Sequence, residues 1–329
     1  MKLGAALALA AIALLVGVAT VAQGAKPYKV ALITDIPPRA STHDFRGLEY
    51  LGFLRAVREL HVQGRVVQTN PKNGAGSALA LLGRQKYDLV YTGLASIPEV
   101  EAAAERFPET HFLFPGPYAL LKSKPANVQG EDFRIEQAGY LAGYLAGLME
   151  TRRPGKDVIG SVAGLSLPPI DDWIVGFELG ARKADPGVTV LRRYSHDFQD
   201  PAKCRAVAGA EIAGGAGVLF QVAGLCGRGT LAAAKQNGLW GIGVDGDESY
   251  LGPHVLTSAI ARYDVAVYRA IEALVEGRLE TRGDYRYDLA NGGVALGRIS
   301  PDVPRSVLRR LDAVRARIVA GAIRVPRST

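Results

Sequence analysis

Short runs of β-branched and other apolar residues alternate with amphipathic stretches along the chain from about residue 29 onwards. A β-branched run of five to seven residues predicts a buried strand, and apolar residues at a spacing of three to four predict a helix. Predicted strands cover 29–35, 65–68, 88–93, 111–114, 127–133, 158–163, 189–194, 218–222, 240–245, 255–261 and 293–296. Predicted helices cover 44–60, 76–84, 98–107, 136–147, 171–184, 201–212, 229–237, 263–277 and a terminal stretch to 320.

This strand-then-helix alternation predicts an α/β protein with doubly wound parallel sheets. The 329 residues are enough for two such lobes. We place residues 26–133 with 262–284 in the first lobe and 134–261 with 285–329 in the second. Several chain crossings then join the lobes, an arrangement that permits hinge closure around a ligand.

Residues 3–22 are almost wholly apolar and follow Lys2. Residues 1–25 therefore form either a cleaved signal peptide or a retained amino-terminal anchor, and both place the rest of the chain outside the cytoplasm. No cysteine lies near residue 25, so no acceptor for a lipid anchor is visible there.

The two cysteines, Cys204 and Cys226, lie at the start of a predicted helix and just after the next predicted strand. Those two ends fall on the same edge of a βαβ unit, and export permits oxidation. We expect a disulfide between them; the alternative is two separate buried thiols.

Glycines recur at 139, 143 and 147 in one predicted helix. The segment is too short to span a bilayer. We expect these glycines to let the helix pack closely on a sheet.

No residue pattern indicates catalysis, a metal or a cofactor. The five histidines are isolated from one another, and neither a phosphate-binding loop nor a nucleophile elbow is present. Gly241, Gly243 and Gly246 match a dinucleotide fingerprint only in spacing, because they lie inside and after a strand. The formal charge of +7 is spread out, and the basic run 305–317 has the spacing of a solvated helix face, so nucleic-acid binding is not expected.

Polar and aromatic side chains near strand ends are the candidates for ligand contacts. Asp245 ends a strand, where its carboxylate either accepts hydrogen bonds from ligand hydroxyls or caps the next turn. Phe45, Trp173 and Phe177 lie on helices that follow strand-end loops. They either stack on a planar ligand ring or pack in the core.

These segments together resemble the basic membrane protein (BMP) family of substrate-binding proteins, which includes purine nucleoside receptors of ABC importers. The resemblance rests on Phe45 with Tyr50 and Gly52, and on the run Glu-Gln-Ala-Gly-Tyr-Leu-Ala-Gly at 136–143. Further matching segments are 34–35, 176–180, 200–203, 220–224, 242–245, 256–258 and 264–268.

The resemblance implies a type I periplasmic-binding fold with the ligand between the lobes. It implies that Phe45 stacks on a base, that Asp245 contacts a ribose, and that Asp35 and Phe177 line the pocket. The strand-end positions Gly93, Val222 and Gly224 complete the expected set.

The chain departs from the family pattern at three places. Arg46 replaces an Asn, Ala261 replaces a frequent Lys, and Gly93-Leu94-Ala95 replaces Gly-Phe-Ala. Without the Lys, the site loses a contact to a ligand hydroxyl, while Arg46 brings a positive charge to the expected ligand-binding residues. A purine nucleoside and an anionic or differently substituted ligand both remain open.

We therefore expect an exported, non-enzymatic receptor that binds a nucleoside-like ligand and presents it to an ABC permease. Two alternatives come from other classes. One is a membrane-anchored ligand sensor that retains residues 1–22; the other is a nucleoside-processing or nicotinamide-dependent enzyme.

Overall fold

The computed structural model describes residues 26–35, 44–70, 73–93, 95–155 and 157–328. The expected signal peptide or anchor, residues 1–25, lies outside this part of the chain. Within it, no helix is both long and apolar enough to cross a membrane.

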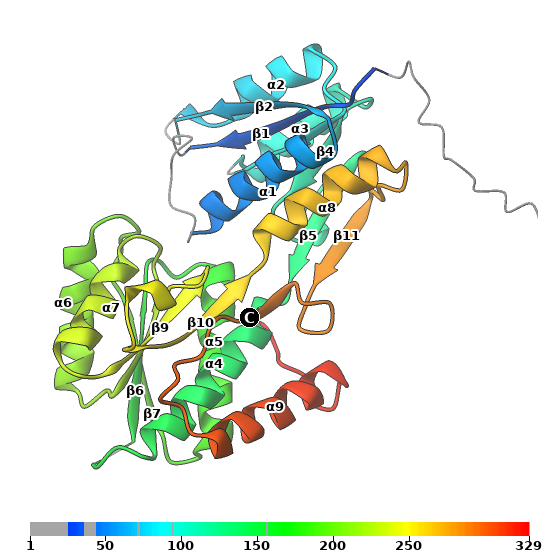
Figure 1. The fold of residues 1–329 in the computed structure, drawn as a ribbon. Coiled ribbons are helices and arrows are strands. Elements are labelled where there is room, and N and C mark those ends of the chain that lie inside the picture. Colours follow the sequence, from blue (N-terminus) through cyan, green and yellow to red (C-terminus); the bar gives the residue numbers. More distant parts are fainter. Residues whose placement is uncertain (1–25, 36–43, 71–72, 94, 156, 329) are drawn as a thin grey trace, which may run out of the picture.

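The first lobe is built on a six-stranded parallel sheet (Figure 1). In the order β11-β5-β4-β3-β1-β2, its strands are Gly283–Tyr287, Val128–Phe133, His111–Phe114, Leu89–Tyr91, Lys29–Thr34 and Gln63–Gln68. One face is covered by α1 (Phe45–Glu59) and α8 (Tyr263–Val275). The other face is covered by α2 (Gly76–Arg84) and α3 (Ile97–Arg106).

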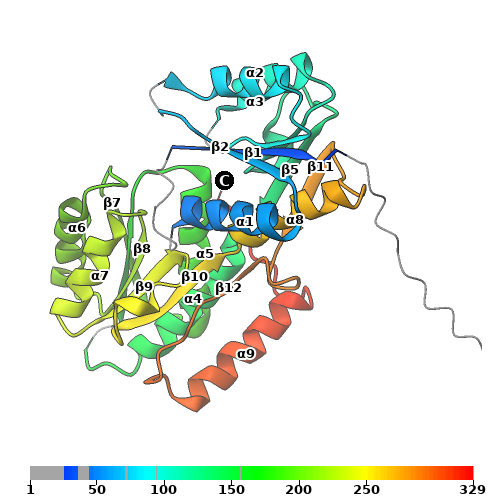
Figure 2. The ribbon, with the colours of Figure 1, turned by 45° about the horizontal axis from the view of Figure 1, so that its top comes forward.

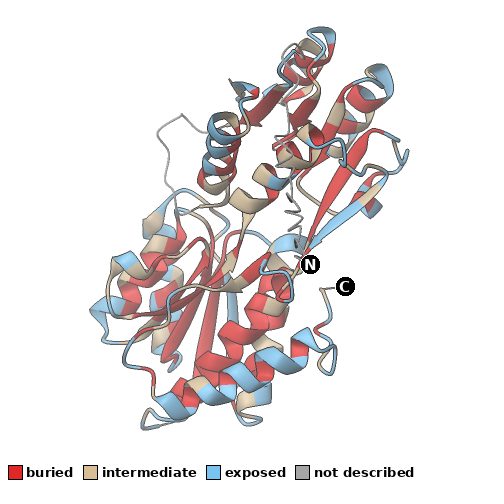
Figure 3. Cartoon of the chain, turned by 45° about the vertical axis from the view of Figure 1, so that its right-hand side comes forward, coloured by how far each residue is buried: buried red, intermediate tan, exposed pale blue. Residues whose placement is uncertain are grey.

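The second lobe repeats this plan with one antiparallel edge strand. In the order β12-β10-β9-β8-β6-β7, its strands are Val294–Leu296, Val255–Ala261, Trp240–Asp245, Val218–Val222, Val158–Ala163 and Thr189–Tyr194. Helices α4 (Ile135–Glu150), α5 (Pro168–Ala184) and α9 (Arg305–Val319) share the core of one face. Helices α6 (Pro201–Ala213) and α7 (Gly227–Gln236) cover the other. Figure 3 shows α4 buried almost throughout, whereas α9 is exposed on its outer side.

The described chain passes between the two sheets three times. The crossings lie at Arg134 between β5 and α4, at Arg262 between β10 and α8, and at 288–293 between β11 and β12. These crossings form the hinge, and together with the two sheets they give the α/β two-lobe architecture that the sequence predicted.

Strand β11 is absent from the strands predicted above. This strand pairs with β5 in the first sheet as far as Tyr287, three residues beyond the 284 at which we placed the lobe boundary. Its middle residues are exposed, and only Tyr287 is buried, so its sequence lacks the apolar run that marks the inner strands.

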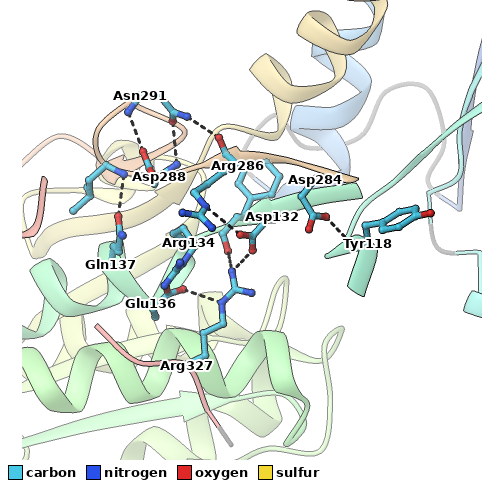
Figure 4. Close-up of polar contacts among 12 residues, drawn as sticks. Tyr118, Asp132, Arg134, Glu136, Gln137, Asp284, Arg286, Asp288, Asn291 and Arg327 are labelled. Carbon is cyan, nitrogen blue, oxygen red and sulfur yellow. Dashed lines mark hydrogen bonds and ion pairs between the residues drawn. The ribbon is translucent and has the colours of Figure 1, made fainter. Parts of the chain in front are cut away.

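The carboxyl-terminal residues fold back onto the hinge (Figure 4). Arg327 forms ion pairs with Asp132 at the end of β5 and with Glu136 in the first turn of α4. Arg286 reaches the same Asp132, and Arg134 pairs with Glu136. The chain thus neutralises the carboxylates of its own hinge.

The glycines of α4 face a helix, which corrects our expectation that they would meet the sheet. A Cβ on Gly143 would lie 1.8 Å from the Phe177 carbonyl oxygen, and one on Gly139 would lie 2.4 Å from that of Trp173. Gly176 and Gly180 of α5 approach α4 equally closely. Glycine on both helices therefore lets α4 and α5 pack backbone to backbone.

The expected pairing of the cysteines is present. Cys204 in the first turn of α6 and Cys226 at the start of α7 form a disulfide, with Cα atoms 5.5 Å apart. Both residues are fully buried. The bridge fixes the loop that carries Gly224 from the end of β8 to α7.

Candidate ligand cleft

Residues of both lobes line a cleft at the carboxyl ends of the strands, where parallel sheets bind ligands. A small hollow of about 20 Å³ lies between Asp44 of the first lobe and Gln221, Gly224, Asp245 and Glu248 of the second. A larger hollow of about 440 Å³ is lined by Leu48 of α1 and by the chain after β9. Asp245 lines both, and Figure 2 shows α1 between the first sheet and the strands β9 and β10.

Asp245 is held in an unusual backbone conformation at the end of β9. Its φ is +64°, a left-handed value that L-residues seldom adopt. Burial, with the nearby carboxylates of Asp44 and Glu248, raises the pKa of its carboxyl to about 7, against the lowering effect of Arg46. Left-handed backbone and a perturbed pKa both cluster at functional sites, so their coincidence makes Asp245 a candidate ligand contact.

Two residues beside Asp245 were not among the sequence candidates. Gln221 donates a hydrogen bond from Nε2 to Oε2 of the buried Glu248, 2.6 Å away. Burial raises the pKa of Glu248 to about 7, against the lowering effect of that hydrogen bond. Gln221 lies beside the predicted Val222, and Glu248 lies in the acidic run after β9, so both stood next to positions that the sequence singled out.

The first lobe contributes a compact group of three predicted residues. Arg46 Nε lies 2.9 Å from Asp35 Oδ1, and the guanidinium carbon lies 5.0 Å from the centre of the Phe45 ring. The Phe45 ring meets Tyr263 edge-on at 6.0 Å. Asp44, which lines the small hollow, caps α1 by accepting a hydrogen bond from Gly47 N.

A buried carboxyl–tyrosine–carboxyl chain extends the site behind α1. Tyr91 Oη lies 2.6 Å from Glu49 Oε1 and 3.3 Å from Glu131 Oε2. The hydroxyl has one proton to donate, so when Glu49 accepts it, Glu131 must itself be protonated to bond Tyr91. Burial raises the pKa of Glu49 to about 8 and that of Glu131 well above its usual range. No pattern in the sequence indicates this group.

Both predicted cleft glycines have positive φ. Gly93 follows β3 with φ +56°, and a Cβ there would lie 2.0 Å from the Ile33 carbonyl oxygen. Gly224 follows β8 with φ +55°. Their backbones turn sharply at the strand ends, which only glycine does without strain.

The other predicted site residues lie in the core of the second lobe. Phe177 is fully buried, with its ring 4.9 Å from that of Phe220, and Trp173 is 3% exposed. Val222 belongs to the same core cluster. The structure does not bring these three together with Asp35, Phe45 and Arg46, and packing, the alternative considered for the aromatics, accounts for their positions.

The described residues contain no group of three or more His, Cys, Asp or Glu side chains with the geometry of a metal site. Ala261, which replaces the family's Lys, ends β10 and lines the larger hollow. The cleft therefore offers hydrogen-bonding carboxyls, the Asp–Arg pairs Asp35–Arg46 and Asp264–Arg262, the guanidinium of Arg228 and aromatic rings.

A family model described as "ABC transporter substrate-binding protein PnrA-like" matches residues 45–329. The chain belongs to this family. Its relatives include basic membrane protein B of Borrelia garinii, 37% identical over 147 residues, and an uncharacterized lipoprotein of Pyrococcus abyssi, 31% identical over 270 residues. These matches cover 44% and 77% of this chain but only 42% and 65% of the two relatives, less than two thirds of either.

Solved structures of solute-binding proteins share the fold. That of an ABC transporter solute-binding protein from Aeropyrum pernix K1 has a TM-score of 0.80 at 23% identity, covering 91% of this chain and 94% of the other. A second such protein, from Conexibacter woesei, has a TM-score of 0.72 at 25% identity, covering 91% and 98%. The two-lobe fold is thus that of solute-binding proteins.

Proposed function

We propose that this protein is the extracytoplasmic receptor of an ABC importer and closes on an uncharged, nucleoside-like ligand. The ligand lies between the lobes, is not chemically altered, and passes to a permease in the membrane. Family membership supports the receptor role, and the cleft chemistry supports the ligand class.

One observation carries the ligand class: Asp245 lies in the cleft with a strained backbone and a raised pKa. A carboxyl in this state gains most from a ligand that brings hydrogen-bond donors, because those bonds favour its charged form. Adjacent ribose hydroxyls are such donors. The Phe45 ring, which follows the hollow-lining Asp44 at the start of α1, offers an apolar face for a planar base.

The cleft differs from a typical enzyme site because its carboxyls of raised pKa are not paired with a nucleophile. The carboxyls with raised pKa values are Glu49, which bonds Tyr91, Glu248, which bonds Gln221, and Asp245, which is repelled by nearby carboxylates. Neither cysteine nor lysine is among the described residues that line the two hollows, and Asp247 accepts its hydrogen bond from the backbone N–H of Ser249, not from the hydroxyl. The cleft thus favours reversible binding over covalent chemistry.

Calorimetry of the purified protein with a panel of nucleosides, bases and sugars tests the proposal. We expect one nucleoside to bind per chain and to be recovered unchanged by chromatography. At 100 times its dissociation constant that ligand should add about 2.7 kcal/mol of stability. Asp245→Ala should weaken binding by about tenfold or more, because a charge-assisted hydrogen bond is lost. Asp302→Ala, at an exposed position, serves as the control.

A converted product would refute the receptor role. Equal affinity of Asp245→Ala and the unsubstituted protein would remove Asp245 from the site, and binding of sugars or anions alone would refute the ligand class.

A further inference from the structure

Arg46 is the basic side chain that the first lobe places beside the candidate base-stacking ring. It follows Phe45 in the first turn of α1, and its side chain remains 23% exposed. Arg46 lowers the pKa of Asp245 in the opposite lobe, so its positive charge interacts with the Asp245 carboxyl across the cleft. Any ligand that stacks on Phe45 would therefore meet this guanidinium.

Two contacts position the guanidinium. Its Nε lies 2.9 Å from Asp35 Oδ1, an ion pair without hydrogen-bond geometry, and its carbon lies 5.0 Å from the Phe45 ring centre. Asp35 itself is only 11% exposed at its side chain. All N–H groups of an arginine are donors, and its Nη1 and Nη2 form a planar pair. Within the described residues, neither of those two nitrogens of Arg46 forms a hydrogen bond.

The surrounding charge restricts what this fork can bind. Asp44, Asp245 and Glu248 line the small hollow together with Arg228, and burial raises the pKa of Asp245 and Glu248. An anionic ligand such as a nucleotide would bring its phosphate among these groups. In their charged forms the three acids outnumber Arg228, so like-charge repulsion opposes an anion, and the fork is left to bind a neutral edge that carries two acceptors.

We propose that Arg46 determines specificity in this cleft by selecting uncharged rings whose edge presents two adjacent acceptors. The inference rests on the proposed function. An oxo-substituted purine presents O6 and N7, both acceptors, to which arginine bonds in a bidentate manner. An amino-substituted purine presents the N7 acceptor beside the N6 donor. Because arginine carries only donors, its second N–H group would then meet the N6 donor and form no hydrogen bond.

The experiment compares inosine, adenosine, 7-deazainosine and inosine monophosphate by calorimetry on the full chain. We expect inosine to bind about tenfold or more tightly than adenosine, from the usual discrimination of one bidentate contact. 7-Deazainosine, which lacks the N7 acceptor, should lose most of that advantage. Inosine monophosphate should bind more weakly than inosine.

Two variants assign the preference to Arg46. Arg46→Gln should favour adenosine, because a glutamine amide pairs with N6 and N7 of adenine. Arg46→Lys retains the charge but not the fork, so it should reduce the preference for inosine. The control is Arg55→Gln, which removes an exposed arginine from the same helix and should leave the preference intact.

The outcomes separate this inference from the proposed function. Nucleoside binding without preference, a preference for adenosine, or inosine preference retained in both Arg46 variants would overturn the role of Arg46 alone. Equal or tighter binding of inosine monophosphate would overturn the selection against charge. Absence of binding by every nucleoside would overturn the proposed function and, with it, this inference.

Discussion

The hinge and the cleft both bury carboxyl groups between the lobes, but they balance the charge differently. In the hinge, Glu136 is fully buried and lies within ion-pair distance of Arg134 and Arg327. Asp132 likewise meets Arg286 and Arg327. Burial still raises the pKa of Glu136, while both arginines lower it.

In the cleft, the described acids outnumber the bases near them. Burial raises the pKa of Glu49 to about 8 and that of Asp245 and Glu248 to about 7, and Arg46 opposes the effect at Glu49 and Asp245. In the hinge, arginines of the chain itself lie beside the buried carboxylates as counter-charges. On the proposed function, hydrogen-bond donors of the ligand stabilise the carboxylates of the cleft.

The sharpest way to break this comparison is to remove the arginine shared by the hinge carboxylates. Arg327→Ala should lower the free energy of unfolding by about 2–3 kcal/mol, because Glu136 and Asp132 lose a counter-charge where water is scarce. Urea denaturation at pH 7 measures this change.

Arg278→Ala is the matched control. Arg278 also pairs with two carboxylates, Glu272 and Glu276, but its side chain is 59% exposed. Exposed pairs contribute about 0–1 kcal/mol, so this variant should shift the urea midpoint little. Equal effects of the two substitutions would contradict the distinction between the hinge and an ordinary surface pair.

Glu49 should make the ligand-free protein less stable as pH rises. Its pKa is about 8 in the folded state against an ordinary value of 4.5, so between those pH values the folded state holds a proton that the unfolded state has released. Stability should therefore fall from pH 5 to pH 8 and level off above that.

Glu49→Gln should flatten this slope, by about 1–2 kcal/mol between pH 5 and pH 8. Glu105→Gln, on an exposed face of α3, should leave the slope unchanged. Urea midpoints measured across the range check both variants. A slope that Glu49→Gln does not alter would show that the burial of Glu49 carries no cost.

The smallest expected effect separates stability from binding at Asp245. Asp245→Asn should raise the stability of the ligand-free protein at pH 8 by up to about 1 kcal/mol, because an amide carries no charge to bury. The same variant should bind nucleosides more weakly. Loss of both stability and affinity would instead place Asp245 with the hinge residues, as a structural group.

The sequence predicted the elements whose signals are local. Apolar runs located the strands of both sheets except β11, and Asp35, Phe45 and Arg46, three of the candidate ligand-binding residues, lie together in the structure. Strand β11 escaped because an exposed edge strand needs no apolar run.

The remaining features depend on tertiary contacts. Glu49, Tyr91 and Glu131 are far apart in the sequence, and their spacing does not show that α1 packs Glu49 against Tyr91 of β3 and Glu131 of β5. Likewise, Arg327 joins the hinge only because the chain after α9 folds back on it. Trp173 and Phe177 share a helix face that suits stacking and packing equally, and the contact of α5 with α4 decided where that face lies.

The most direct test of the central claim counts the protons exchanged when a nucleoside binds. Calorimetry with inosine at pH 7, in two buffers of different ionisation enthalpy, gives this number. If ligand donors act on cleft carboxyls whose pKa burial raises, binding should release protons, and Asp245→Asn should release fewer. Equal heats in both buffers, with the same affinity in the variant, would contradict the account.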